Sequence, residues 1–327
     1  TPAHADLKLD LGGYFRGYAV YVNQDQQGAG TPSLSKFDFL KDAEVHFTGE
    51  TTTDMGLTVG AHFELKMLNN GFGGFGGYNI APQKPNGSNT FGSQVDESYA
   101  YFSGGWGRDN FGAEDGAAYP LQVAATSADS NIDGLRPTIQ GFESSVWADG
   151  TATGLTTNPF VGGNAANYVL GYDNADFRQT DRITYLTPKW NGFQAGVSYA
   201  PNQGAIGITG GTAGLPANNI NGTFKNLWEA SARWDGAFSG VGISLGGGYA
   251  SASNEKNGAG PGNGNFGSDN FQDWDAGLNL TWQGWSLGGA YDHNNTGVNT
   301  NGDVKKWDVG LGWDNGPWHA GASWMYA

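Results

Sequence analysis

The most metal-like pattern in the chain is a run of oxygen-bearing side chains near its middle. Asp129, Asn131 and Asp133, followed by Gly134, match the first half of a calcium-binding loop, Asp-x-Asn-x-Asp-Gly. The position that should supply a bidentate glutamate is Gln140, so the complete helix-loop-helix form fails. Two interpretations stay open: calcium held within this loop, or a simple polar turn. Neither makes a cofactor a requirement.

Other residue types that carry chemistry are scattered. The five histidines show no local zinc spacing. His46 and His62 share one polar face and could approach each other across neighbouring strands, where we expect them to line that face rather than to bind a metal. The glycine-rich run 71–77 has no lysine and no following helix, so it is not a phosphate-binding loop. No Gly-x-Ser-x-Gly motif with suitable partners is visible, which argues against a hydrolase. We therefore expect a protein that is not an enzyme.

Composition and charge narrow the possible partners. The chain has 16 basic and 31 acidic residues and a formal net charge of −15, which disfavours nucleic acid as a partner and favours cations. It has no cysteine, so disulfides and thiolate metal sites are excluded. Mean hydropathy is −0.45, and no stretch approaches the ~18 apolar residues of a membrane helix. Residues 1–5 resemble the surroundings of a signal cleavage site, which predicts an exported protein whose signal peptide is removed.

The sequence pattern predicts that the elements positioning these residues are β-strands. In residues 56–66, Leu57, Val59 and Phe63 fall on one face while His62 and Glu64 fall on the other. The same alternation recurs in residues 193–199, 274–282 and 307–313. A strand of about ten residues, tilted near 45°, spans the hydrocarbon layer of a bilayer. Strands with one apolar and one polar face are typical of a transmembrane β-barrel.

The connections between the predicted strands alternate in length. Short turns are expected near residues 51–53, 104–107, 189–192, 235–240, 283–284 and 314–317. Between them lie long loops rich in Gly, Asn and Pro, at 23–35, 69–93, 115–175, 201–222, 251–267 and 293–302. An antiparallel up-and-down barrel predicts this alternation, whereas a sandwich with Greek-key crossings does not. Residues 1–327 are therefore expected to form one all-β barrel domain.

About 13 strands are predicted along the chain, and an odd number is unexpected for a single-chain bacterial barrel. They lie at residues 6–22, 36–49, 54–68, 94–105, 107–114, 176–187, 192–200, 223–234, 237–250, 270–282, 284–292, 303–313 and 317–326. Either the strand count is wrong or about three C-terminal strands lie beyond this sequence, and we expect 16 strands in the intact barrel.

Tryptophan lies beside most of the predicted short turns. Indole rings favour the headgroup boundary of a membrane, where their apolar body and polar N–H are both satisfied. These residues predict an aromatic girdle at one membrane surface, with ordinary hydrophobic hairpin clusters as the alternative. The girdle residues are Trp190, Trp234, Trp282, Trp285, Trp313 and Trp318.

The polar positions of the alternation supply the candidate lining of the barrel. On this basis the inward-pointing residues are Tyr14, Arg16, Tyr18, Glu44, His46, His62, Glu64, Lys66, Arg178, Arg182, Lys225, Glu229 and Arg233.

Several segments, in order along the chain, resemble the general porins of alphaproteobacteria. Glu-Asp-Gly-Ala-Ala-Tyr at 114–119 follows a strand and is similar to the entrance to loop 3 of that family. The runs 181–188 and 192–201 resemble the next hairpin, and 9–15 resembles the first strand. Two positions depart from the family pattern: Ala113 stands where arginine is usual, and Ala327 stands where an aromatic C-terminus is usual.

The resemblance implies a homotrimer of 16-stranded barrels in the bacterial outer membrane, among outer-membrane lipids and lipopolysaccharide. It also implies that loop 3, residues 115–175, folds into the lumen and narrows it. In such a constriction, loop acids face wall bases. The acidic candidates are Glu114, Asp115, Asp129, Asp133, Glu143 and Asp149, and the basic candidates are Arg16, Arg178, Arg182 and Arg233.

The expected function is a water-filled channel for passive diffusion of small hydrophilic solutes and ions. The excess of acids predicts a preference for cations. Two alternatives remain: a substrate-selective, sugar-type channel, in which Tyr14 and Tyr18 would serve as ring contacts, and a surface adhesin or carbohydrate-binding β-protein. An adhesin would be soluble without detergent, whereas a porin would extract as a heat-modifiable oligomer.

Overall fold

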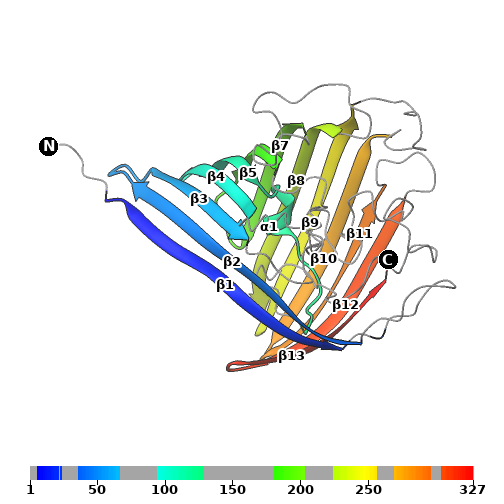
Figure 1. Ribbon diagram of the computed structural model, residues 1–327. Helices are drawn as coiled ribbons and strands as arrows, with labels where there is room; N and C mark the ends of the chain where they lie inside the picture. The colour runs from blue at the N-terminus through cyan, green and yellow to red at the C-terminus, as the bar shows by residue number, and fades with distance from the viewer. Residues whose placement is uncertain are drawn as a thin grey trace, which may run out of the picture.

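The computed structural model describes residues 6–21, 23, 36–66, 94–128, 180–202, 224–255, 269–295 and 303–326. These residues form thirteen β-strands and one short helix, α1 (Ala118–Leu121) (Figure 1). The strands are β1 (Lys8–Tyr21), β2 (Phe37–Thr52), β3 (Thr58–Lys66), β4 (Gln94–Gly104), β5 (Gly107–Glu114), β6 (Thr180–Leu186), β7 (Phe193–Asn202), β8 (Phe224–Phe238), β9 (Val241–Asn254), β10 (Phe271–Trp282), β11 (Trp285–Asn294), β12 (Val304–Asn315) and β13 (Trp318–Tyr326).

The strands form one antiparallel sheet in which each strand pairs with its neighbours in sequence. The order runs from β1 to β13 without a crossover, so β1 and β13 are the edges of the described sheet. This is the predicted all-β, up-and-down topology, and the predicted strands correspond one to one with the observed ones. Among the described residues, no helix is long and apolar enough to cross a membrane.

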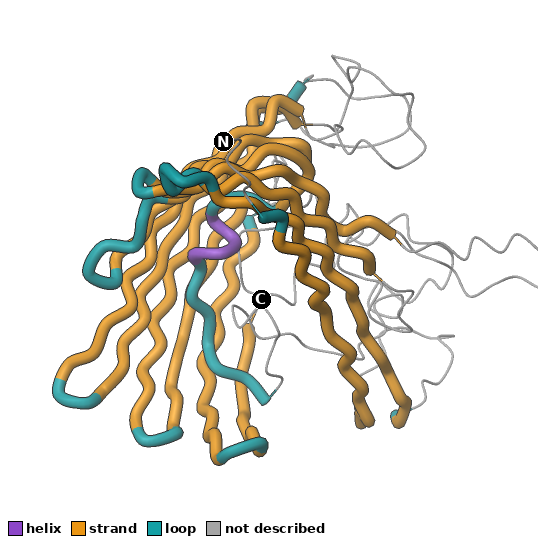
Figure 2. The backbone as a smooth tube through the Cα atoms, turned by 90° about the vertical axis from the view of Figure 1, so that its left-hand side faces the viewer, coloured by secondary structure: helices purple, strands orange, loops and turns teal. Residues whose placement is uncertain are grey.

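Six short turns join β2 to β3, β4 to β5, β6 to β7, β8 to β9, β10 to β11 and β12 to β13. Because successive strands reverse direction, all six turns lie at the same rim of the sheet, and several are visible as loops along one edge in Figure 2. We call this edge the turn rim.

Three of these turns have the backbone conformation that tight hairpins require. Asn191 and Gly192 have φ of 47° and 84°, Ser239 and Gly240 have 51° and 82°, and Gln283 and Gly284 have 48° and 84°. Two consecutive positive φ values are the signature of a type I′ turn, whose twist matches that of the flanking strands. Glycine at the second position makes that conformation sterically easy.

One predicted turn was placed two residues too early. The sequence pattern predicted a turn near residues 51–53, but β2 continues to Thr52 and the chain reverses over residues 53–57. Thr51 and Thr52 are β-branched residues that favour an extended backbone. The Thr52 hydroxyl also lies 2.8 Å from the Thr58 hydroxyl across the hairpin, which extends the pairing.

Candidate functional site

The two faces of the sheet differ in polarity, as the period-two pattern predicted. One face, which we call the outer face, exposes large apolar side chains: Leu9, Phe15, Phe47 and Leu278 are all exposed there. The opposite face, the inner face, carries Glu44, His46 and Thr48 on β2 and Asp273 and Asp275 on β10, which lie at alternate positions. Several of the inner side chains are buried although they are charged.

A segment after β5 lies against the inner face. In Figure 2, α1 and the chain that follows it run on the concave side of the sheet. α1 contacts β7, β8 and β9, and residues 122–128 continue across β9 to β13. We call residues 115–128 the inner segment. They are the described part of the predicted loop 115–175.

The start of the inner segment is hydrogen-bonded to polar side chains of the wall. The backbone N–H of Ala117 donates to Ser198 Oγ at 3.1 Å, and Ser231 Oγ donates to the Ala117 carbonyl at 2.9 Å. The N–H of Ala118 donates to Glu229 Oε2 at 3.3 Å. These three wall residues lie on β7 and β8, so both strands share the anchoring of α1.

The later part of the inner segment is anchored through its carbonyl groups. Arg233 donates to the Gln122 carbonyl at 3.3 Å, and Asn279 Nδ2 lies 3.5 Å from the Ala124 carbonyl. Thr126 Oγ1 donates to Asn279 Oδ1 at 3.2 Å. At the far end, His319 Nε2 lies 2.7 Å from the carbonyl of Ser127. The wall therefore holds the backbone of the inner segment from β8 to β13.

Glycines on the inner face make room for this backbone. A Cβ added to Gly246 on β9 would lie 2.8 Å from the Leu121 carbonyl oxygen, and one added to Gly321 on β13 would lie 2.8 Å from that of Ser127. At Gly277 on β10 and Gly310 on β12, a Cβ would come still closer to the carbonyls of Val123 and Thr126. Real Cβ atoms do not approach that closely, so these strands need glycine where the inner segment crosses them.

A buried ion pair lies beneath α1. Arg182 Nη1 on β6 is 2.5 Å from Glu229 Oε1 on β8, and both side chains are almost fully buried. The pair reaches over β7, where the small residue Ser198 faces Glu229. A Cβ on Gly116 would clash with the Glu229 carboxylate, which explains the glycine that follows Asp115. The alternation placed Arg182 on the wall and the family resemblance implied that it would oppose loop acids, but its acidic partner here, Glu229, lies on the wall.

The remaining predicted wall and loop residues have diverse surroundings. Glu114 is buried at the end of β5 and accepts a hydrogen bond from Asn110 at 2.6 Å. The backbone N–H of Asp115 donates to Glu97 Oε1 at 3.2 Å. Arg233 pairs with Asp235, two residues along the same strand, at 2.9 Å. Tyr14 lies edge-on to His46, with 6.1 Å between ring centroids.

Some predicted residues fall outside what the structure describes. Arg16, Tyr18 and Lys66 lie in β1 and β3 by backbone position only, and their side chains are not among the described ones. The acidic, basic and calcium candidates that lie outside the described residues are Asp129, Asn131, Asp133, Glu143, Asp149 and Arg178. Their roles remain predictions.

A second group of buried charges lies on β10, β11 and β12 and was not singled out from the sequence. Lys306 Nζ is 2.9 Å from Asp292 Oδ1, and Asn294 donates to Asp273 Oδ2 at 3.1 Å. Asp308 accepts from the N–H of Ala290 at 2.9 Å. The alternation predicted in residues 307–313 placed Asp308 on the polar face, but no sequence pattern indicated that these charged side chains would gather.

The tryptophans of the predicted girdle lie at the turn rim. Trp282, Trp285 and Trp318 are exposed at the ends of strands, Trp190 is exposed in the turn between β6 and β7, and Trp313 is exposed near the end of β12. Trp285 faces Trp313 across the β11–β12 pair, with 6.2 Å between ring centroids. Trp234 lies near the same rim and donates to the Asn191 carbonyl at 3.1 Å. Their contact with a membrane surface remains a prediction.

Comparisons with known proteins agree with this architecture. The family model for Gram-negative porins matches residues 1–327. OmpF of Salmonella typhi, solved in complex with daunomycin, has a TM-score of 0.59 at 13% identity, over 98% of this chain and 78% of that one. An anion-selective porin from Comamonas acidovorans has a TM-score of 0.54 at 15% identity, with the same shares covered.

A third solved structure, the trimer form of OmpT from Vibrio cholerae, has a TM-score of 0.51 at 12% identity, over 98% of this chain and 77% of that one. At these identities the likenesses show the fold alone, and the resemblance to the alphaproteobacterial subgroup remains a prediction. A search of curated proteins finds no match. Because the family model covers the whole chain, this protein belongs to the Gram-negative porin family: it is an outer-membrane channel and not an enzyme.

Proposed function

We propose that this porin is a diffusion channel for small hydrophilic solutes that prefers cations. The observation that carries the proposal is the sign of the charge gathered in the described part of the molecule. Eight acidic residues are buried there against two basic ones. The acids are Glu44, Glu114, Glu229, Glu255, Asp273, Asp275, Asp292 and Asp308, and the bases are Arg182 and Lys306.

The partly exposed inner face supports the same sign. Glu64 on β3 is accessible, and the chain as a whole carries a formal charge of −15. The bases Arg182, Arg233 and Lys306 each have a carboxylate within 2.9 Å, so their positive charge is largely compensated. Rings of acidic side chains favour cations in channels. The fold likeness to an anion-selective porin, at 15% identity, does not bear on this preference.

Loop 115–175 is proposed to narrow the passage. The support is the inner segment, its described beginning, whose backbone is bound across the inner face from β8 to β13. A homotrimer within outer-membrane lipid and lipopolysaccharide completes the proposal. It is supported by the family and by the solved trimer form of OmpT, a protein of the same fold.

The test is the reversal potential of the reconstituted protein in a planar bilayer under a potassium chloride gradient. We expect stepwise currents and a reversal potential whose sign shows that potassium crosses more easily than chloride. Glu64→Gln should lower the ratio of cation to anion permeability, because the side chain lies on the inner face. Asp109→Asn makes the same charge change on β5 at a position that faces outward and should leave the ratio unchanged.

A reversal potential of the opposite sign would refute the cation preference. Sugars of graded size, added to the same bilayer, distinguish a general channel from the sugar-selective alternative. A general channel should show a current reduced only as solute size approaches the size limit, whereas saturable block by one sugar class would favour the alternative.

A further inference from the structure

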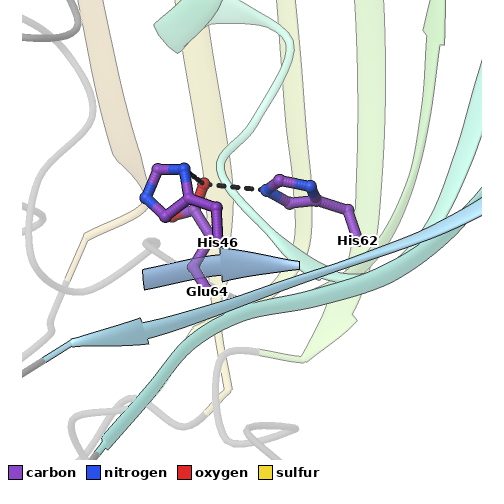
Figure 3. A group of neighbouring side chains, drawn as sticks. All are labelled: His46, His62 and Glu64. Carbon is purple, nitrogen blue, oxygen red and sulfur yellow. Dashed lines mark hydrogen bonds and ion pairs between the residues drawn. The ribbon is translucent and has the colours of Figure 1, made fainter. Parts of the chain in front are cut away.

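Three potential metal ligands converge on the inner face of β2 and β3. His46 on β2 lies directly opposite Glu64 on β3. His62 lies opposite Thr48, the next inward-facing residue of β2, and is therefore diagonal to His46. Figure 3 shows both imidazole rings directed toward the Glu64 carboxylate. The backbone register therefore brings His46 beside two side chains that are 16 and 18 residues away in sequence. The outward neighbours Phe47 and Phe63 are exposed on the opposite face, so the cluster faces inward.

The ligand atoms are spaced as a bound ion requires. His62 Nε2 lies 2.9 Å and His46 Nδ1 lies 3.6 Å from Glu64 Oε1, and one ligand atom from each residue lies within 4.8 Å of the others. Ligands held about 2.0–2.2 Å from zinc in a tetrahedron are themselves a little over 3 Å apart. Small side-chain rotations would therefore bring all three onto one ion.

A second set of contacts fixes the orientation of each ring. Glu44 Oε2 lies 3.2 Å from His46 Nε2, and Thr48 Oγ1 lies 2.7 Å from His62 Nδ1. Each histidine thus has one ring nitrogen engaged by the wall and the other directed at Glu64. A hydrogen bond to the far nitrogen, in particular from a carboxylate, is the arrangement that orients histidine ligands in metal sites. Glu44 is buried, so it is held in place for this contact.

The donor set indicates which ions would bind. Two imidazole nitrogens and one carboxylate oxygen suit zinc, copper and nickel, whereas calcium and magnesium prefer oxygen ligands. The side chains of His46, His62 and Glu64 keep 25%, 16% and 17% of their accessible surface. An ion here could therefore take its remaining ligand from water.

We propose that His46, His62 and Glu64 form a binding site for a divalent transition-metal ion on the inner wall of this porin, with Glu44 and Thr48 orienting the two imidazoles. The neutral imidazoles bind through His46 Nδ1 and His62 Nε2, and their remaining N–H groups donate to Glu44 and Thr48. The ion adds positive charge to the wall, where Glu44 and Glu64 compensate it.

The experiment measures zinc binding to the full chain, refolded in detergent, by equilibrium dialysis. We expect one saturable zinc per chain, not displaced by a hundredfold excess of calcium. Glu44→Gln should weaken binding about 10- to 100-fold, the effect of losing an orienting partner, and His62→Gln should weaken it more. His293→Gln, on β11 outside the cluster, is the matched control and should bind zinc as the unaltered protein does.

Bound copper supplies a second readout, its electron paramagnetic resonance spectrum. The spectrum of the unaltered protein should show coupling to two imidazole nitrogens, and that of His62→Gln should show coupling to one. The proposal is overturned if no saturable zinc binding is found, if calcium displaces zinc, or if His62→Gln binds as tightly as His293→Gln. A copper spectrum without imidazole coupling in the unaltered protein would overturn it as well.

Discussion

Arg182 and Glu229 meet in a region from which water is almost excluded, so each depends on the other. Glu229 also accepts a hydrogen bond from the backbone N–H of Ala118, which connects this ion pair to the start of the inner segment. A buried pair is costly to desolvate, and breaking it leaves an uncompensated charge. The pair therefore acts mainly as a fixed anchor for α1, and it contributes less to overall stability than its short distance suggests.

Glu229→Ala should lower the free energy of unfolding by about 3–5 kcal/mol, because Arg182 would stay buried without its carboxylate. Urea unfolding in lipid vesicles, followed by tryptophan fluorescence, measures the change. The double variant Arg182→Met with Glu229→Leu replaces both charges by apolar side chains of similar size and should recover most of the loss. A single variant as stable as the unaltered protein would show that the pair is not buried as described.

At the scale of the elements, the backbone of the inner segment is bound mainly by side chains of the strands beneath it. Polar wall residues bind the peptide groups of the segment, and Gly246, Gly277, Gly310 and Gly321 let its carbonyls approach four different strands. The segment also buries apolar side chains of its own, among them Ala118, Leu121 and Val123.

Gly310→Ala should displace the inner segment, because the added methyl group would meet the Thr126 carbonyl. Amide hydrogen exchange of residues 122–128 should become faster by about tenfold or more, the sign of a locally weakened segment. Gly12→Ala is the matched control: it is the same change on the inner face, and its Cβ would lie 3.7 Å from the nearest atom, His46 Cβ, an ordinary contact. Equal exchange in both variants would contradict the proposed fit.

The sequence predicted the strands well because period-two alternation is a local property, and each strand carries it independently. The short turns with Trp and Gly were predicted for the same reason. Partners within the site were harder to predict. Alternation assigned Arg182 and Glu229 to one face, but their meeting depends on the register of three strands and on the small Ser198 between them. The gathering of His46, His62 and Glu64 depends on the β2–β3 register in the same way.

At the scale of the whole molecule, the sheet separates two environments. Its outer face exposes apolar side chains, its inner face carries the charges and the inner segment, and exposed tryptophans lie both near the turn rim and toward the opposite ends of the strands. Such a sheet is stable only where the outer face meets hydrocarbon and the inner face meets water, because charged groups are costly in lipid. Channel function, the proposed cation preference and the proposed metal site all depend on this division.

Neighbouring residues on opposite faces test the division directly. The chain contains no cysteine, so single cysteines can be placed without altering other residues. Three adjacent pairs suit the test, each with a serine on the inner face and an exposed apolar residue on the outer face: Ser103 and Phe102, Ser244 and Leu245, and Ser286 and Leu287.

The decisive measurement is the relaxation of nitroxide spin labels at these six positions in lipid vesicles. Labels replacing the serines should be relaxed by a water-soluble nickel chelate, and labels replacing Phe102, Leu245 and Leu287 should be relaxed by oxygen dissolved in the hydrocarbon. If both members of each pair respond alike, or if the pattern is reversed, the sheet does not divide lipid from an aqueous passage.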